Sequence, residues 1–87
     1  MNTGKFKNEL LHILYKNETN KCNKSKMQVE IKELFNNNTK LYREIAKELT
    51  LYGYIYAQFV DQLEEPISIH IENKGMIKYK EQKGIVF

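Results

Sequence analysis

Residues 39–71 read TKLYREIAKELTLYGYIYAQFVDQLEEPISIHI, and this stretch decides the fold. Its first half has apolar residues at the spacing of one helix face: Leu41, Ile45 and Leu49. Gly53 is well placed to end this helix, because glycine readily takes the left-handed conformation of a helix exit. The pattern predicts a helix from Thr39 to about Tyr52.

From Ile55 onward the apolar residues recur at every second position. Apolar and polar residues alternate through Phe59, and again from Ile67 to Ile71, as in half-buried strands. The polar residues up to Pro66 separate the two runs and predict a turn. A hairpin is unstable on its own, so we expect the isoleucine row of the second strand to pack on helices.

Two helices are predicted upstream of this stretch. Residues 5–16 carry an apolar stripe of helical period, and the polar residues 17–25 interrupt it as a loop. A second helix is predicted from Ser25 or Lys26, with a short strand over residues 27–29 as the alternative. The asparagines at 36–38 end this helix and cap the next one.

The C-terminal part is predicted to add one short helix. It starts near Asn73 and includes Met76, Ile77 and Tyr79. The apolar tail, residues 84–87, is expected to dock on the body of the domain. The fold class is therefore α+β: a three-helix core, a two-stranded β-hairpin wing and a short closing helix.

Two segments resemble winged-helix proteins. Residues 49–55, LTLYGYI, look like the end of a recognition helix entering the first wing strand, and residues 71–75, IENKG, resemble the turn into the closing helix of many bacterial regulators. Within that superfamily, the ending from Lys74 resembles the YjcQ family of small phage and bacterial proteins. The resemblance implies that the third helix lies in the major groove of DNA.

Size and composition narrow the classes of protein. Eighty-seven residues form a single domain, 1–87, because two cores of half that size would not fold unaided. No apolar run is long enough for a membrane span or a signal peptide, and one cysteine, Cys22, makes neither an internal disulfide nor a thiolate zinc site. We expect a cytoplasmic protein with no membrane partner.

The formal net charge of +3 is unevenly distributed along the chain. Residues 1–26 contain six lysines against two glutamates, and residues 73–87 contain four lysines against one glutamate. Residues 54–72 contain four carboxylates and no lysine or arginine. The basic ends favour a nucleic-acid partner, whereas the acidic middle does not.

The third helix contains the candidate DNA-binding residues. They are Asn38, Thr39, Lys40, Tyr42, Arg43 and Lys47. The three cations fall on one stripe of the helix, and residues at the helix start add neutral contacts to phosphates or bases. The alternative is an ordinary solvated face, since Glu44 and Glu48 are placed for pairing within the helix.

The hairpin offers candidate residues for protein contact. They are the tyrosines Tyr52, Tyr54 and Tyr56 and the acidic turn residues Asp61, Glu64 and Glu65. Carboxylates repel phosphates, so the turn suits a basic protein partner better than DNA, and the tyrosines suit a homodimer interface. The alternatives are a plain soluble turn and aromatic packing. No cation flanks the tyrosines in sequence, which makes base stacking the weaker option.

Nothing in the sequence predicts an enzyme. His12 and His70 are isolated, neither has a spacing motif with Cys22, and no glycine-rich phosphate loop is present. We expect no catalytic residue, metal or cofactor. A further basic patch is predicted from the lysines near the first loop, with simple solubilising charge as the alternative: Lys5, Lys7, Lys21, Lys24 and Lys26.

Two functions therefore compete. The first is a small winged-helix DNA-binding or transcription-regulatory protein, related to phage proteins by its resemblance, that binds double-stranded DNA through the third helix. The second is a winged-helix module that binds another protein, or a second copy of itself, through the acidic wing and the tyrosine-rich strand.

Overall fold

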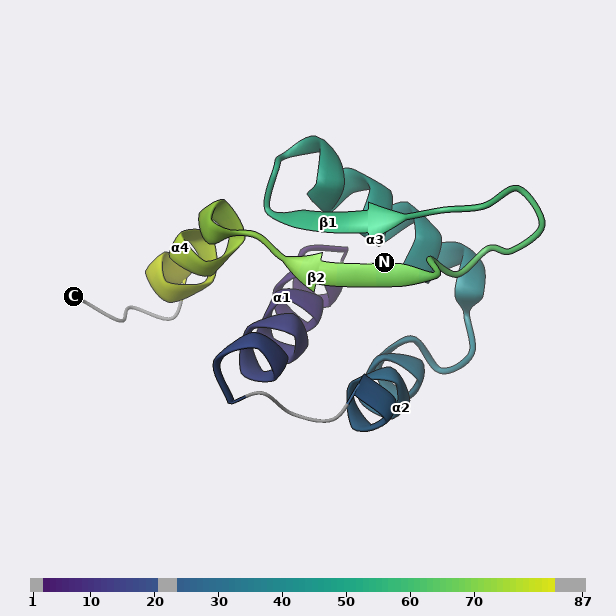
Figure 1. The fold of residues 1–87 in the computed structure, drawn as a ribbon, viewed down its shortest axis with the longest axis horizontal. Coiled ribbons are helices and arrows are strands. Elements are labelled where there is room, and N and C mark those ends of the chain that lie inside the picture. Colours follow the sequence, from purple (N-terminus) through teal and green to yellow (C-terminus); the bar gives the residue numbers. More distant parts are fainter. Residues whose placement is uncertain (1–2, 21–23, 83–87) are drawn as a thin grey trace.

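The structure is a computed structural model that describes residues 3–20 and 24–82. The elements in chain order are α1 (Thr3–Asn20), α2 (Lys24–Phe35), α3 (Thr39–Leu51), β1 (Ile55–Gln58), β2 (Ser68–Ile71) and α4 (Asn73–Gln82) (Figure 1). Four helices and one two-stranded antiparallel hairpin make this described part of the chain an α+β structure, as predicted.

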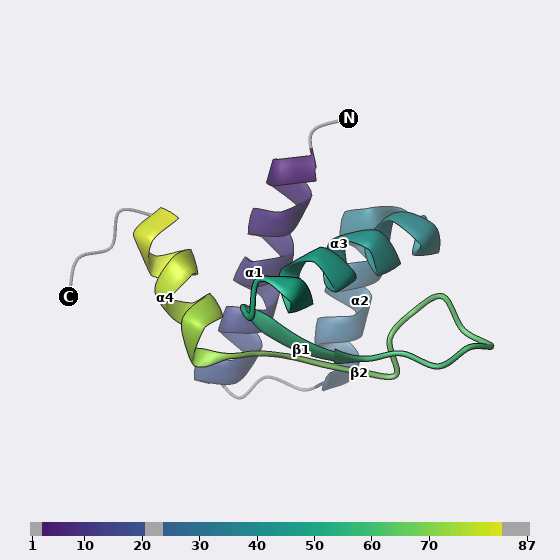
Figure 2. The same cartoon turned by 90° about the horizontal axis from the view of Figure 1, so that it is seen from above.

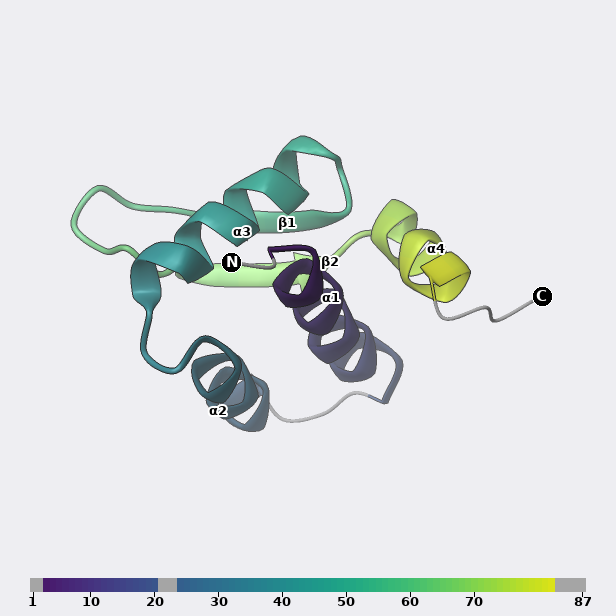
Figure 3. The same ribbon diagram turned by 180° about the vertical axis from the view of Figure 1, so that it is seen from behind.

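The core lies between α1, α2 and α3, and α1 and α3 pack against one face of the hairpin (Figure 3). Leu10, Leu11 and Leu14 of α1 are almost completely buried, as are Ile45 and Leu49 of α3. Burial of one such side chain contributes about 1.5–3 kcal/mol to stability. The apolar stripes found in the sequence are therefore the surfaces that join the helices.

The loop predicted over residues 17–25 is wrong in its bounds. Helix α1 continues to Asn20, where Thr19 bonds back to the carbonyl oxygen of Tyr15 at 2.9 Å, and α2 already begins at Lys24. An ion pair of 3.0 Å between Lys16 and Glu30 links the two helices. The alternative strand over residues 27–29 is also wrong, because these residues lie within α2.

The hairpin has the predicted order and a well-defined register. Ile55 lies opposite Ile71, and both are buried against the helices. The predicted isoleucine row is only partly correct: Ile69 is half-buried, and Ile67 is 51% exposed. The reason is geometric, because the loop between the strands extends past the helices, at the end of the molecule opposite α4 (Figure 2).

Helix α4 closes the domain beside α1. The carbonyl oxygen of Glu72 accepts its first bond, from the amide of Met76 at 3.0 Å. Tyr79 is buried, and its ring stacks on His12 and lies 4.7 Å from the ring of Tyr15. The predicted docking of residues 84–87 lies outside the described residues.

Candidate nucleic-acid interface

Three asparagines position the start of α3. Asn36 and Asn37 take positive φ angles of 49° and 64°, which reverse the chain after α2. The side-chain oxygen of Asn38 then accepts a hydrogen bond of 3.1 Å from the backbone amide of Leu41. Asparagine is a favoured residue at this capping position, and its cap contributes about 1 kcal/mol. Asn38 therefore uses its side-chain oxygen to begin the helix.

The three cations of α3 leave the helix on its outer side, away from the buried stripe. Lys40 and Lys47 are exposed, whereas Arg43 is half-buried. The guanidinium of Arg43 lies 5.0 Å from the ring centre of Phe59, and Nζ of Lys47 lies 5.7 Å from the same ring. Cation–π contacts with this β1–β2 loop residue hold both side chains beside the hairpin.

Tyr42 is not part of this outer face, and its prediction as a DNA contact is wrong. Its side chain is 8% exposed and its ring stacks on Phe35 at 5.1 Å. Tyr42, Ile45, Ala46 and Leu49 follow the i, i+3, i+4, i+7 spacing of one helix face, which was the signal for burial. Burial and the nearby Glu65 raise the pKa of Tyr42 above its usual range.

The loop between β1 and β2 contains Asp61, Glu64 and Glu65 and is called the acidic loop below. It lies against the N-terminal end of α3. The hydroxyl of Thr39 donates to Oε2 of Glu64. Nη1 of Arg43 donates to the carbonyl oxygen of Leu63 at 2.9 Å and lies 3.5 Å from that of Glu64. Two predicted DNA contacts are thus engaged with the loop predicted for protein contact, and carboxylates stand next to the first turn of α3.

The predicted protein-contact residues do not form one surface. Tyr52 and Tyr54 lie at the C-terminal end of α3, whereas Glu64 contacts Thr39 at its N-terminal end. A helix of this length separates its ends by about 20 Å. Tyr56 lies at a third position, on the hairpin, where its ring stacks on His70 with 5.1 Å between the ring centres.

The lysines of the two chain ends gather around Tyr52 and Tyr54, which sequence reasoning missed. Nζ of Lys7 lies 5.9 Å from the ring centre of Tyr52, and Nζ of Lys74 lies 5.7 Å from that of Tyr54. Lys78 and the two tyrosines line one hollow of the surface, together with Lys7. The available signal was the charge excess at both termini, but only the packing of α4 on α1 brings these charges together.

Glu48 connects this cluster to α3. Its Oε1 accepts a bond from Nζ of Lys7 at 2.5 Å and one from the hydroxyl of Tyr52 at 3.0 Å. The hydrogen bond from Lys7 is the main cause that lowers the pKa of Glu48, and the same bond raises the pKa of Lys7. Both groups are charged at neutral pH, so the pair fixes α1 to α3 at this end.

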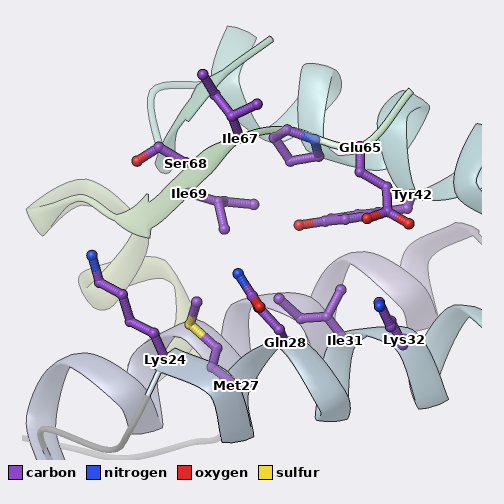
Figure 4. A pocket seen from close by; sticks show the side chains of 11 residues that line it. Lys24, Met27, Gln28, Ile31, Lys32, Tyr42, Glu65, Ile67, Ser68 and Ile69 are labelled. Carbon is purple, nitrogen blue, oxygen red and sulfur yellow. The ribbon is translucent and has the colours of Figure 1, made fainter. Parts of the chain in front are cut away.

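A pocket of about 170 Å³ opens between α2 and β2 (Figure 4). Tyr42 extends into it from α3, Gln28 and Ile31 reach it from α2, and Ile69 reaches it from β2. Neither histidine lines this pocket. His70 Nε2 lies 3.2 Å from Oε1 of Glu72 on the exposed side of the hairpin.

The remaining predictions concern a metal site, a membrane span and residues near the first loop. Within residues 3–20 and 24–82, no three His, Cys, Asp or Glu side chains are grouped to hold a metal ion. In that same part of the chain, no helix has both the length and the apolar character needed to cross a bilayer. Lys21 of the predicted basic patch and Cys22 lie outside the described residues.

Comparisons with protein-family models, with curated proteins and with solved structures find no match to this chain.

Proposed function

We propose that the protein is a small winged-helix domain that binds double-stranded DNA through the outer face of α3. The observation that carries the proposal is the placement of Lys40, Arg43 and Lys47 on one side of a helix whose opposite side is buried. The order of three helices, hairpin and closing helix supports the winged-helix assignment. Transcription regulation and a relation to phage and YjcQ proteins follow from the resemblance alone.

The acidic loop limits how a duplex can approach. Glu64 stands beside Thr39 at the start of α3, so phosphates at that end meet a carboxylate. Lys40 and Lys47 are both exposed: Lys40 follows Thr39 in the first turn, whereas Lys47 lies about two turns farther along the outer face. We therefore assign the main phosphate contacts to these two lysines, with Arg43 joining when it exchanges its carbonyl bonds for a phosphate.

The test is a fluorescence-anisotropy titration with a labelled duplex of about 20 base pairs at several salt concentrations. We expect salt-dependent binding, and we expect the Lys40→Ala, Lys47→Ala double variant to bind more weakly and to reduce the log–log salt slope by about 2. The matched control, Lys26→Ala with Lys32→Ala, removes two exposed lysines of α2 instead. No binding by the unaltered protein, or equal losses in both double variants, would contradict the proposal.

Protein contact through the acidic loop is the second candidate. Leu63 and Ile67 are 53% and 51% exposed and flank Glu64 and Glu65, so the loop combines apolar and acidic groups on one projection. This combination suits a basic partner that also offers apolar area. Leu63→Ser should abolish that binding while leaving duplex binding intact; a partner retained by this variant would rule out the loop as the binding surface.

A further inference from the structure

A hollow of about 360 Å³ lies at the C-terminal end of α3, away from the acidic loop. Its walls include Tyr52 and Tyr54, whose rings lie 5.5 Å apart and are tilted by 47°. Tyr52 is 46% exposed. Gly53, between the two tyrosines, has a φ of 79°. Glycine takes this backbone conformation readily, and the turn that it makes brings the rings of Tyr52 and Tyr54 together.

Cations surround these rings. Lys7 and Lys74 each lie within 6 Å of one tyrosine ring centre, as given above, and Lys78 lines the hollow together with Lys7. Glu48 pairs with Lys7 and so offsets one of the three positive charges. The surface therefore remains basic, in contrast to the loop at the other end of α3.

Polar and apolar groups complete the hollow. Leu11 and Leu49 contribute buried apolar side chains, and Asn8 contributes an amide that both donates and accepts hydrogen bonds. Aromatic rings that stack on bases, cations that meet phosphates and an amide for a base edge are the groups that recognise unpaired nucleotides. A duplex keeps its base faces stacked inside and cannot use the tyrosines.

We propose that this hollow, lined by Lys7, Asn8, Tyr52, Tyr54 and Lys78 and with Lys74 beside the Tyr54 ring, binds single-stranded nucleic acid. The proposal is independent of duplex binding by the outer face of α3, because the two surfaces share none of their contact residues. A chain with both surfaces would hold a duplex and the unpaired strand that continues from it.

The probes are labelled oligonucleotides of about ten nucleotides, one of deoxythymidine and one of uridine, titrated by anisotropy at about 0.1 M salt, where distant charges are screened. We expect both Tyr52→Leu and Lys78→Glu to weaken binding by about tenfold. Equal binding of both probes would show that the site accepts single-stranded DNA and RNA alike. Tighter binding of one probe would show that the site prefers that type of nucleic acid. Both results support the proposal.

Two control variants match these changes elsewhere. Tyr56→Leu removes a tyrosine of similar exposure from the hairpin, and Lys32→Glu reverses an exposed lysine on α2; each should change binding less than about twofold. Circular dichroism checks that all four variants fold. Absence of binding to either probe, or equal losses in test and control variants, overturns the proposal. Lys78→Glu should leave duplex binding nearly unchanged, so failure here is distinct from failure of the α3 interface.

Discussion

Gly75 of α4 lies against the carbonyl oxygen of Tyr54, so close that a Cβ at position 75 would be 2.0 Å from that oxygen. The same Cβ would lie 2.9 Å from Cγ1 of Ile71. The amide of Glu72 donates to the Tyr54 oxygen at 2.9 Å, which holds the backbone in place. The junction of hairpin and α4 therefore requires glycine, although position 75 lies inside a helix.

Gly75→Ala should destabilise the protein by about 1–3 kcal/mol, because the clash with backbone outweighs the gain of about 1 kcal/mol in helix propensity. Urea unfolding followed by circular dichroism measures the change. Gly53→Ala is the comparison: its Cβ would meet only Cδ of Lys74 at 3.7 Å, so its cost of about 1 kcal/mol comes from the φ angle alone. Unchanged stability of Gly75→Ala would disprove the close contact.

Tyr42→Ala should lower the free energy of unfolding by about 3–4 kcal/mol, because it empties a buried position beside Phe35. Lys40→Ala, two positions earlier on the exposed side of α3, should change it by less than about 0.5 kcal/mol. Thermal or urea unfolding measures the stability of both variants and so distinguishes the two effects. Equal, small effects would show that Tyr42 is a surface residue after all.

Neutralising the acidic loop should strengthen duplex binding. The triple variant Asp61→Asn, Glu64→Gln, Glu65→Gln removes the three negative charges of the loop whose Glu64 contacts the start of α3, and we expect binding at low salt to tighten by about tenfold. The gain should shrink as salt rises, since exposed charges are screened. An anisotropy series over salt concentration tests this; a loss of affinity would mean that the loop contributes to the DNA contact.

The Lys7–Glu48 pair should make stability depend on pH in the acid range. The folded pKa of Glu48 is lower than the ordinary 4.5, so its contribution is complete above that value and is lost as pH falls through the folded pKa. Lys7 has a raised pKa, so its contribution persists up to about its ordinary 10.5 and is lost only above it. The pair is therefore intact at neutral pH.

Glu48→Gln should accordingly be less stable than the unaltered protein at about pH 6, and the difference should narrow toward pH 3. Urea midpoints measured across this range provide the readout. Glu44→Gln is the control, because among the described residues Glu44 forms no ion pair. A difference that stays constant with pH would mean that Glu48 acts through packing rather than through its charge.

The order of the elements was predictable because it depends on short-range patterns. The stripe of α3, the glycine after it and the alternation from Ile55 each involve residues within a few positions of one another. The bounds of α1 were less predictable, since polar residues such as Asn17 and Thr19 can continue a helix when a neighbouring helix pairs with it. The candidate site was predicted only in part, because a polar stripe does not reveal which of its side chains another segment will engage.

The sequence by itself determined the α+β class, the three buried stripes and the basic outer side of α3, because local periodicity specifies which face of each element avoids water. Tertiary structure alone decided that the acidic loop lies on the start of α3 and that Lys7, Lys74 and Lys78 surround Tyr52 and Tyr54. These contacts join residues far apart in the chain. Their geometry follows from how the helices pack on the hairpin, and no local pattern encodes it.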